Sequence, residues 1–262
     1  VKPLQIGKVK FDTHQLLHLY GQRIEALREL FRTTLALADE DLPGRLRVYM
    51  FKENKDHAVI GPRETGMGNG SSIGLKLMGP RFVYSMWQDP HSLGDDEQLH
   101  RNLVHNVSHL LLSQMLPMQW IGNRSHGWID EGLAHWFEDK VTDRCMNYCY
   151  EEVLTVPGPA GKSGKWRPPV RQLVEQGKLP AFAALSTRNT DQLAFEEHAA
   201  AFAYVDFLLT TQGGAKFRDL VRAAKNGQPM REALQQVYQW NPLTIEAPFQ
   251  EWVRATYPLP GR

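Results

Sequence analysis

LVHNVSHLLL, at residues 103–112, is the stretch that decides the fold of this chain. Apolar side chains surround His105 and His109 and continue through residues 96–115, which predicts a helix buried along much of its length. A spacing of i, i+4 places both imidazoles on one face of that helix. Two imidazoles stacked in this way can share a divalent metal ion.

A third candidate ligand follows in the stretch WIDEGLA at residues 128–134. Glu131 lies 22 residues beyond His109, in a second expected helix that begins near Asp130. A histidine pair on an apolar helix is by itself more often part of the core than a ligand set. Buried ionisable groups require partners, however, and two imidazoles with one carboxylate are a donor set that zinc uses. The three residues together therefore favour a metal site.

The segments before the motif predict a helix and a small sheet. Apolar residues between Leu16 and Leu35 recur at steps of three and four, which is typical of an amphipathic helix. Residues 45–52 alternate as in a half-buried strand. Glycines surround β-prone pieces between residues 66 and 87, which predicts two or three antiparallel strands joined by tight turns.

The segments after the motif predict helices and one long loop. Proline and glycine crowd residues 156–169, which we expect to form an irregular surface loop. Apolar periodicity predicts helices near 196–211, 215–225, 230–239 and 246–255.

We therefore expect an α+β fold that forms one unit from two intimate parts. Residues 1–115 would contain the N-terminal helix, a small, mostly antiparallel sheet and the motif helix. Residues 116–262 would form a mainly helical lobe that carries the third ligand. A chain of 262 residues, 42% of them hydrophobic, is long and apolar enough to bury a full core.

Charge and hydropathy limit the partners. Lys and Arg number 30 against 29 Asp and Glu, a net charge of +1, so we expect no binding of nucleic acid. No apolar run approaches the roughly 18 residues of a membrane span, and we expect a soluble chain.

Cys145 and Cys149 are too few for a disulfide framework, and we expect packed thiols rather than a disulfide or a metal site.

The motifs resemble those of the gluzincins, or peptidase MA-like zinc metallopeptidases, in which H-E-x-x-H is followed by a glutamate in a W-x-x-E-G-L-A-type helix. The matching residues are His105, His109, Trp128, Glu131 and the Gly-Leu-Ala of 132–134. The resemblance covers most of the chain and implies a zincin-like fold, a Zn²⁺ ion held by His105, His109 and Glu131, and a peptide or protein in the cleft. The closing helices resemble those of secreted bacterial members, which implies an extracytoplasmic location.

One departure from this family bears on activity. The motif glutamate, which acts as the general base, is replaced by Asn106. A carboxamide is not basic near neutral pH, and general-base assistance contributes about 10²–10⁴-fold. The resemblance thus implies a zinc-binding domain with impaired or no peptidase activity, which acts by binding peptide or protein.

Two positions around the site also depart from the family. The tyrosine that supports the oxyanion aligns with His198, whose imidazole could donate the same hydrogen bond. The acidic residue that orients a ligand histidine aligns with His135, which leaves Asp130, Glu138 and Asp139 as candidates for that role.

Two other functions fit the same residues. The chain could be an active metallohydrolase in which His198, Asp130 or Glu97 accepts the proton. It could also be a metal-free structural or interaction module in which the histidines only form hydrogen bonds. In the zinc-binding domain that the resemblance implies, an edge strand from residues 73–86 could pair with an extended peptide.

Overall fold

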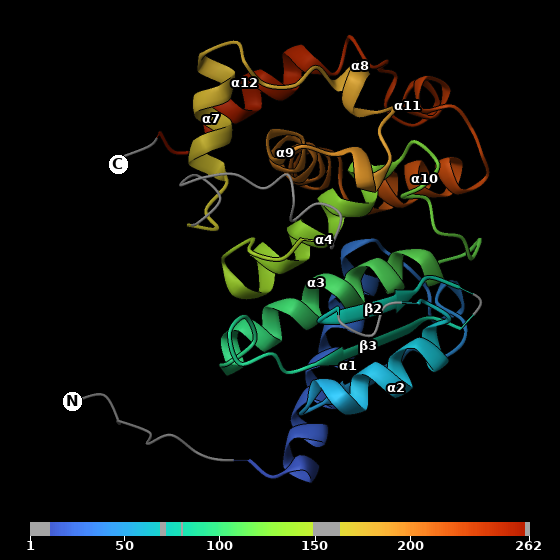
Figure 1. Ribbon diagram of the computed structural model, residues 1–262. Coiled ribbons are helices and arrows are strands. Elements are labelled where there is room, and N and C mark those ends of the chain that lie inside the picture. Colours follow the sequence, from blue (N-terminus) through green and yellow to red (C-terminus); the bar gives the residue numbers. More distant parts are fainter. Residues whose placement is uncertain (1–10, 69–71, 80, 149–162, 260–262) are drawn as a thin grey trace, which may run out of the picture.

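The computed structural model of this chain describes residues 11–68, 72–79, 81–148 and 163–259. A small sheet with α1, α2 and α3 occupies one end of the molecule, and the later helices occupy the other (Figure 1). The helices α3 and α4 lie against each other between these two groups. The fold is therefore a mixed α and β arrangement that is mostly helical, as the sequence predicts.

The three strands of the sheet have the order β1-β3-β2. The outer strand β2 (Gly74–Leu77) runs antiparallel to β3 (Val83–Trp87), whereas β1 (Arg47–Phe51) runs parallel to it. The prediction of a mostly antiparallel sheet is thus wrong for β1. The sequence pattern did not predict α2 (Asn54–Thr65), which connects β1 to β2, and the following strand β3 pairs between these two strands, parallel to β1.

The two faces of the sheet are covered by different helices. Tyr84 and Met86 of β3 share an apolar cluster with Tyr20 of α1 and Leu103 of α3. Ser85 points to the opposite face, where its backbone oxygen lies 3.1 Å from Nε2 of His57 on α2. The central strand is consequently buried on both sides, and α3 packs on the sheet as expected.

Helices α3 (Asp96–Gln114) and α4 (Gly127–Thr142) lie at the centre of the molecule, and α1 (Thr13–Thr34) packs against α3. The predicted N-terminal and motif helices are thereby confirmed. Asp95 caps α3, because its carboxylate accepts a hydrogen bond from the backbone N–H of Gln98 at 2.7 Å. Phe31 of α1 stacks on Phe137 of α4 with ring centroids 5.2 Å apart. One apolar core thus extends from the first helix to the helix that carries Glu131.

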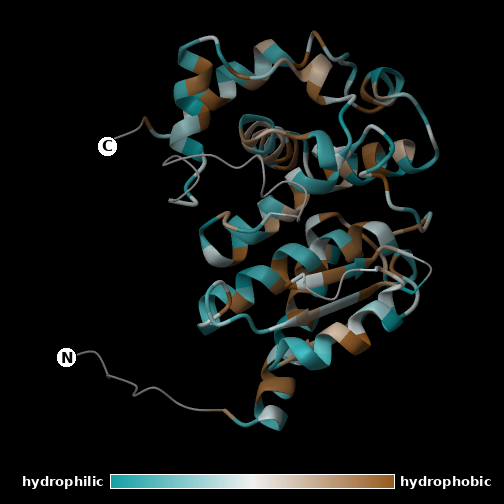
Figure 2. Cartoon of the chain, in the orientation of Figure 1, coloured by the Kyte–Doolittle hydropathy of each residue, from teal (hydrophilic) through white to brown (hydrophobic). Residues whose placement is uncertain are grey.

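The four predicted C-terminal helices are confirmed: α9 (Phe195–Gln212), α10 (Gly214–Lys225), α11 (Met230–Tyr238) and α12 (Glu246–Thr256). Two more helices precede them, α7 (Arg167–Glu175) and α8 (Phe182–Leu185). Short 3₁₀ turns occur at Asp39–Asp41 and Thr190–Gln192. Figure 2 shows apolar residues along the helix faces that meet inside the molecule.

The loop predicted for residues 156–169 is wrong at its C-terminal end. Pro168 and Pro169 belong to the first turn of α7, where a missing backbone N–H costs no intrahelical hydrogen bond. Residues 156–162 of the predicted loop lie outside the described residues. Among the described residues, no helix has both the length and the hydropathy needed to cross a membrane.

Gly132 sets the distance between α4 and α9. A Cβ atom at this position would lie 2.6 Å from the backbone oxygen of Ala201 and 2.9 Å from Cγ2 of Val205. These distances are too short for any side chain, so the absence of one allows the two helix backbones to approach. The neighbouring residue, Glu131, is therefore held close to α9.

We predict that Gly132→Ala destabilises the protein by about 1–3 kcal/mol, because α9 must move away from α4. Urea unfolding measures this change. Gly21→Ala is the matched control, since Gly21 is an exposed helical glycine and a Cβ added there would meet no atom within 4 Å. At position 21, alanine should stabilise the protein by about 0.5–1 kcal/mol through its higher helix propensity alone. Equal effects of the two substitutions would contradict the close packing at Gly132.

Candidate metal centre

The helix α3 brings the two motif histidines together as predicted. Nε2 of His105 lies 3.3 Å from Nε2 of His109, and both side chains are fully buried. The surrounding residues Val104, Val107 and Leu110 are also buried, so neither imidazole contacts bulk water. Two ring nitrogens therefore converge at one point inside the protein.

The helix α4 places Glu131 at the same point. Its Oε1 lies 3.2 Å from Nε2 of His109, and its Oε2 lies 3.7 Å from Nε2 of His105. Trp128 and Leu133, which flank Glu131 on this helix, are fully buried and anchor it in the core. The three residues predicted from the sequence as metal ligands are thus brought together.

The spacing of the three donor groups fits a metal ion. Ligand atoms about 2.0–2.1 Å from a tetrahedral zinc ion lie about 3.3–3.4 Å from one another. The two imidazole nitrogens are 3.3 Å apart, which matches this value, and the nearest carboxylate oxygens lie 3.2 Å from His109 (Oε1) and 3.7 Å from His105 (Oε2). Buried His and Glu side chains in this arrangement could hold a metal ion.

Asp130 orients His109. Its Oδ1 lies 2.9 Å from Nδ1 of His109, and its Oδ2 accepts hydrogen bonds from Nε1 of Trp120 at 2.8 Å and from Oγ1 of Thr190 at 3.2 Å. A carboxylate on Nδ1 keeps the proton there and leaves the lone pair on Nε2, which is the usual arrangement behind a metal-binding histidine. Among the three candidates for this role, Asp130 therefore serves His109.

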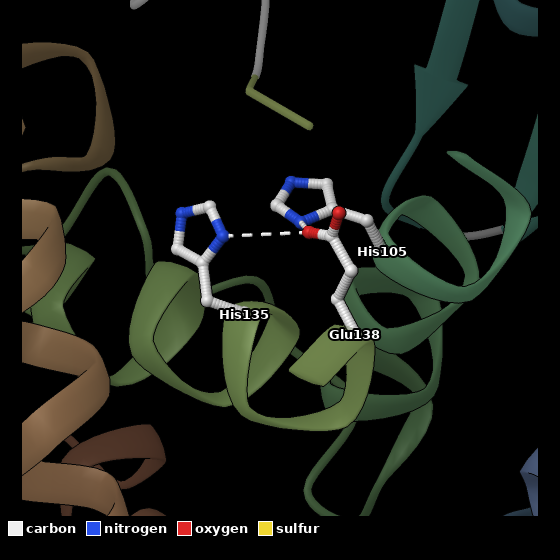
Figure 3. Close-up of side chains that lie close together, drawn as sticks. All are labelled: His105, His135 and Glu138. Carbon is white, nitrogen blue, oxygen red and sulfur yellow. Dashed lines mark ion pairs between the residues drawn. The ribbon is translucent and has the colours of Figure 1, made fainter. Parts of the chain in front are cut away.

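Glu138 has the same position behind His105. Its Oε2 lies 3.3 Å from Nδ1 of His105 and 3.6 Å from Nδ1 of His135, and Figure 3 shows both imidazoles beside this carboxylate. Its Oε1 accepts hydrogen bonds from the backbone N–H of Met146 at 2.7 Å and of Asn147 at 3.1 Å. The third candidate, Asp139, instead forms an ion pair with Arg167 at 2.8 Å.

Burial keeps the imidazoles neutral. The pKa of His105, His109 and His135 is lowered to about 4 each, mainly by burial, and the positive charge of Lys76 on β2 acts in the same direction. Burial would raise the pKa of Glu138, but its contacts with His105 and His135 outweigh this effect and lower the pKa to about 2. Near neutral pH the imidazole lone pairs are available to a cation.

Asn106 lies outside the group of donor atoms. Its Nδ2 donates a hydrogen bond to the backbone oxygen of Asn102 at 2.8 Å, one turn earlier on α3. The side chain is 8% exposed, whereas the ligand residues are fully buried. The residue at the general-base position is therefore bonded to its own helix.

His135 and His198 belong to the same buried cluster. Nε2 of His135 lies 3.5 Å from Oε2 of Glu131, and Nδ1 of His198 lies 3.8 Å from the same oxygen. The two ring nitrogens are 3.1 Å apart. Both residues were expected near the site, but their convergence on Glu131 was not. The sequence could have predicted the contact of His135 with Glu131, because residues at the i, i+4 spacing are neighbours on one helix face.

The remaining candidates lie elsewhere. Glu97 is 64% exposed and pairs with Arg101 at 2.5 Å. The Cys145 thiol is buried and donates to the backbone oxygen of His135 at 3.3 Å, so it is a packed thiol as expected, while Cys149 lies outside the described residues. A buried histidine outside the cluster, His126, lines a separate cavity of about 620 Å³ together with Ala183 of α8 and Met230 of α11.

Comparison of the chain with models of protein families, with curated proteins and with solved structures found no match. What the cluster does is therefore inferred from its own geometry and chemistry.

We predict that the metal-free protein loses stability as the pH falls from about 6.5 to about 4. In the unfolded chain a histidine takes up a proton near pH 6.5, whereas His105, His109 and His135 stay neutral down to about pH 4 when folded, because burial lowers the pKa of each. The unfolded state thus binds more protons over this interval, which lowers the free energy of unfolding. Thermal unfolding in the presence of a chelator, at a series of pH values, measures this loss of stability.

His135→Gln should weaken this pH dependence, because it removes one of the buried imidazoles. His91→Gln is the control, since His91 is exposed and should leave the slope unchanged. A melting temperature that is constant across the interval in the native chain would contradict the burial of neutral histidines.

Proposed function

We propose that this chain is a gluzincin-like domain in which His105, His109 and Glu131 hold a zinc ion. The observation that supports this proposal most strongly is the spacing of the three donor groups, with Asp130 on the far nitrogen of His109. Two imidazoles and one carboxylate are the donor set of catalytic zinc sites, in which a fourth position remains open.

A zinc ion in this site would act as a Lewis acid, which polarises carbonyl oxygens and lowers the pKa of bound water. The chain has no carboxylate at position 106 to accept a proton there. The Asn106 carboxamide can form hydrogen bonds but cannot act as a base near neutral pH. We therefore infer a domain with impaired or no peptidase activity, slower than an intact site by about 10²–10⁴-fold.

An active metallohydrolase with another base is the second candidate. Glu97 pairs with Arg101, and Asp130 already accepts from Trp120 and Thr190 while contacting His109, so neither is suited to the role. His198 is the residue that favours this alternative, because its Nδ1 lies 3.8 Å from Glu131. Burial lowers the pKa of His198 well below the ordinary value, which makes it a weak base.

We infer that the partner is an extended peptide or a protein segment that pairs with β2. This strand is at the outside of the sheet, with β3 as its neighbour among the described residues. The strand contacts α3, the helix that carries His105 and His109. Main-chain hydrogen bonds to such an edge would lay a peptide beside the metal.

We predict that the native chain purifies with zinc and that His109→Ala lowers the content by roughly one equivalent, because one imidazole and its orienting contact with Asp130 are lost. Elemental analysis measures the content. Removal of zinc by a chelator should also lower the melting temperature, since an ion bound only to the native state stabilises it by about 2.7 kcal/mol at a hundred times its Kd.

His91→Ala is the control for zinc content, because His91 is exposed and far from the cluster in sequence. A native chain without zinc, whose melting temperature is unaffected by chelation, would instead identify the cluster as a hydrogen-bonded core of a structural module.

We predict that Asn106→Glu raises hydrolysis of a broad peptide panel by about 10²–10⁴-fold, because it restores a general base beside the metal. Asn106→Gln is the matched control, which has the same length as glutamate but no basic group. If the glutamate variant retains zinc and shows no gain over the glutamine variant, the absence of a base does not explain low activity.

A further inference from the structure

His135 and His198 form a second donor group that the proposed zinc site does not use. Nε2 of His135, Nδ1 of His198 and a carboxylate oxygen of Glu131 lie within 4.8 Å of one another, and all three side chains are fully buried. The two nitrogens are 3.1 Å apart. This group of imidazoles and a carboxylate thus repeats the chemistry of the first site around the same carboxylate.

The two oxygens of Glu131 contact different imidazoles. Oε1 lies 3.2 Å from Nε2 of His109, whereas Oε2 lies 3.5 Å from Nε2 of His135, 3.7 Å from Nε2 of His105 and 3.8 Å from Nδ1 of His198. A carboxylate with imidazoles of both groups around it can bridge two cations, with Oε1 on the ion at His109 and Oε2 on the ion at His135 and His198. Paired metal ions in proteins lie about 3.5–4 Å apart, a distance that a bridging carboxylate spans.

Glu138 directs His135 toward this second position. Its Oε2 lies 3.6 Å from Nδ1 of His135, on the side of the ring away from Glu131. A proton held on Nδ1 leaves the lone pair of Nε2 facing Glu131 and His198. Because Oε2 of Glu138 also lies 3.3 Å from Nδ1 of His105, one carboxylate orients one histidine from each group.

We propose that the chain binds two divalent ions, with Glu131 as the bridging ligand and with His135 and His198 as ligands of the second ion. The donors are borderline ligands, and zinc is the ion that suits them best. This inference rests on the proposed zinc site for its first ion. In the metal-free protein, the close approach of His135 and His198 is a hydrogen bond between the two rings.

The test is the number of ions bound by the full-length native chain. The metal-free protein is loaded with ¹¹³Cd²⁺, and cadmium NMR together with elemental analysis counts the sites. We expect two resonances and two equivalents of metal. His198→Gln should lose one resonance and one equivalent, and His126→Gln, which removes a buried histidine outside the cluster, should lose neither. Circular dichroism establishes that each variant is folded.

The outcomes separate the two proposals. A native chain that binds one ion, lost in His109→Ala but retained in His198→Gln, overturns the second site and leaves the first. One ion lost in both variants means a single ion shared by all the histidines, which also overturns it. No bound ion overturns the second site and the zinc-binding function together. The count in the native chain decides the question even if a variant does not fold.

Discussion

Burial of the Glu131 carboxylate among four imidazoles is the constraint on which the rest of the structure depends. A carboxylate with no exposure must have polar partners, because an isolated buried charge costs many kcal/mol. Its partners come from α3, from α4 and from α9. A shift of any of these helices by one turn would remove at least one imidazole. Gly132 allows α9 to approach the backbone of α4, so that the partner from α9 can reach Glu131.

Much of the fold follows from periodicity in the sequence. Apolar spacing is a strong signal in long helices, which explains why α1, α3 and α9 to α12 are predicted close to their observed bounds. The signal fails at α2, where Gly61 and Pro62 indicate a break although both lie within the last turns of a helix. The strand order is missed as well, because β3 pairs between β1 and β2 and therefore runs parallel to β1. No periodicity within a single strand encodes this order.

The candidate site is predictable only where its residues share a helix or a motif. His105 and His109 share a helix, and Glu131 is found from its motif. His135 and Glu138 also follow Glu131 on one face of α4, at spacings that place them together. His198 is different, because it reaches the cluster from a distant segment through the packing of α9 on α4. No spacing in the sequence encodes that contact.

The absence of a base at position 106 does not change the free-energy cost of burying the acidic side chains of this cluster. Asp130, Glu131 and Glu138 are three acidic side chains with almost no exposure, and the imidazoles around them are neutral because burial depresses their pKa values. A bound cation would offset the repulsion among these carboxylates, whereas Asn106, bonded to its own helix, takes no part in it. In the site that we propose, metal binding and proton transfer are separable, because the three donor residues are distinct from Asn106.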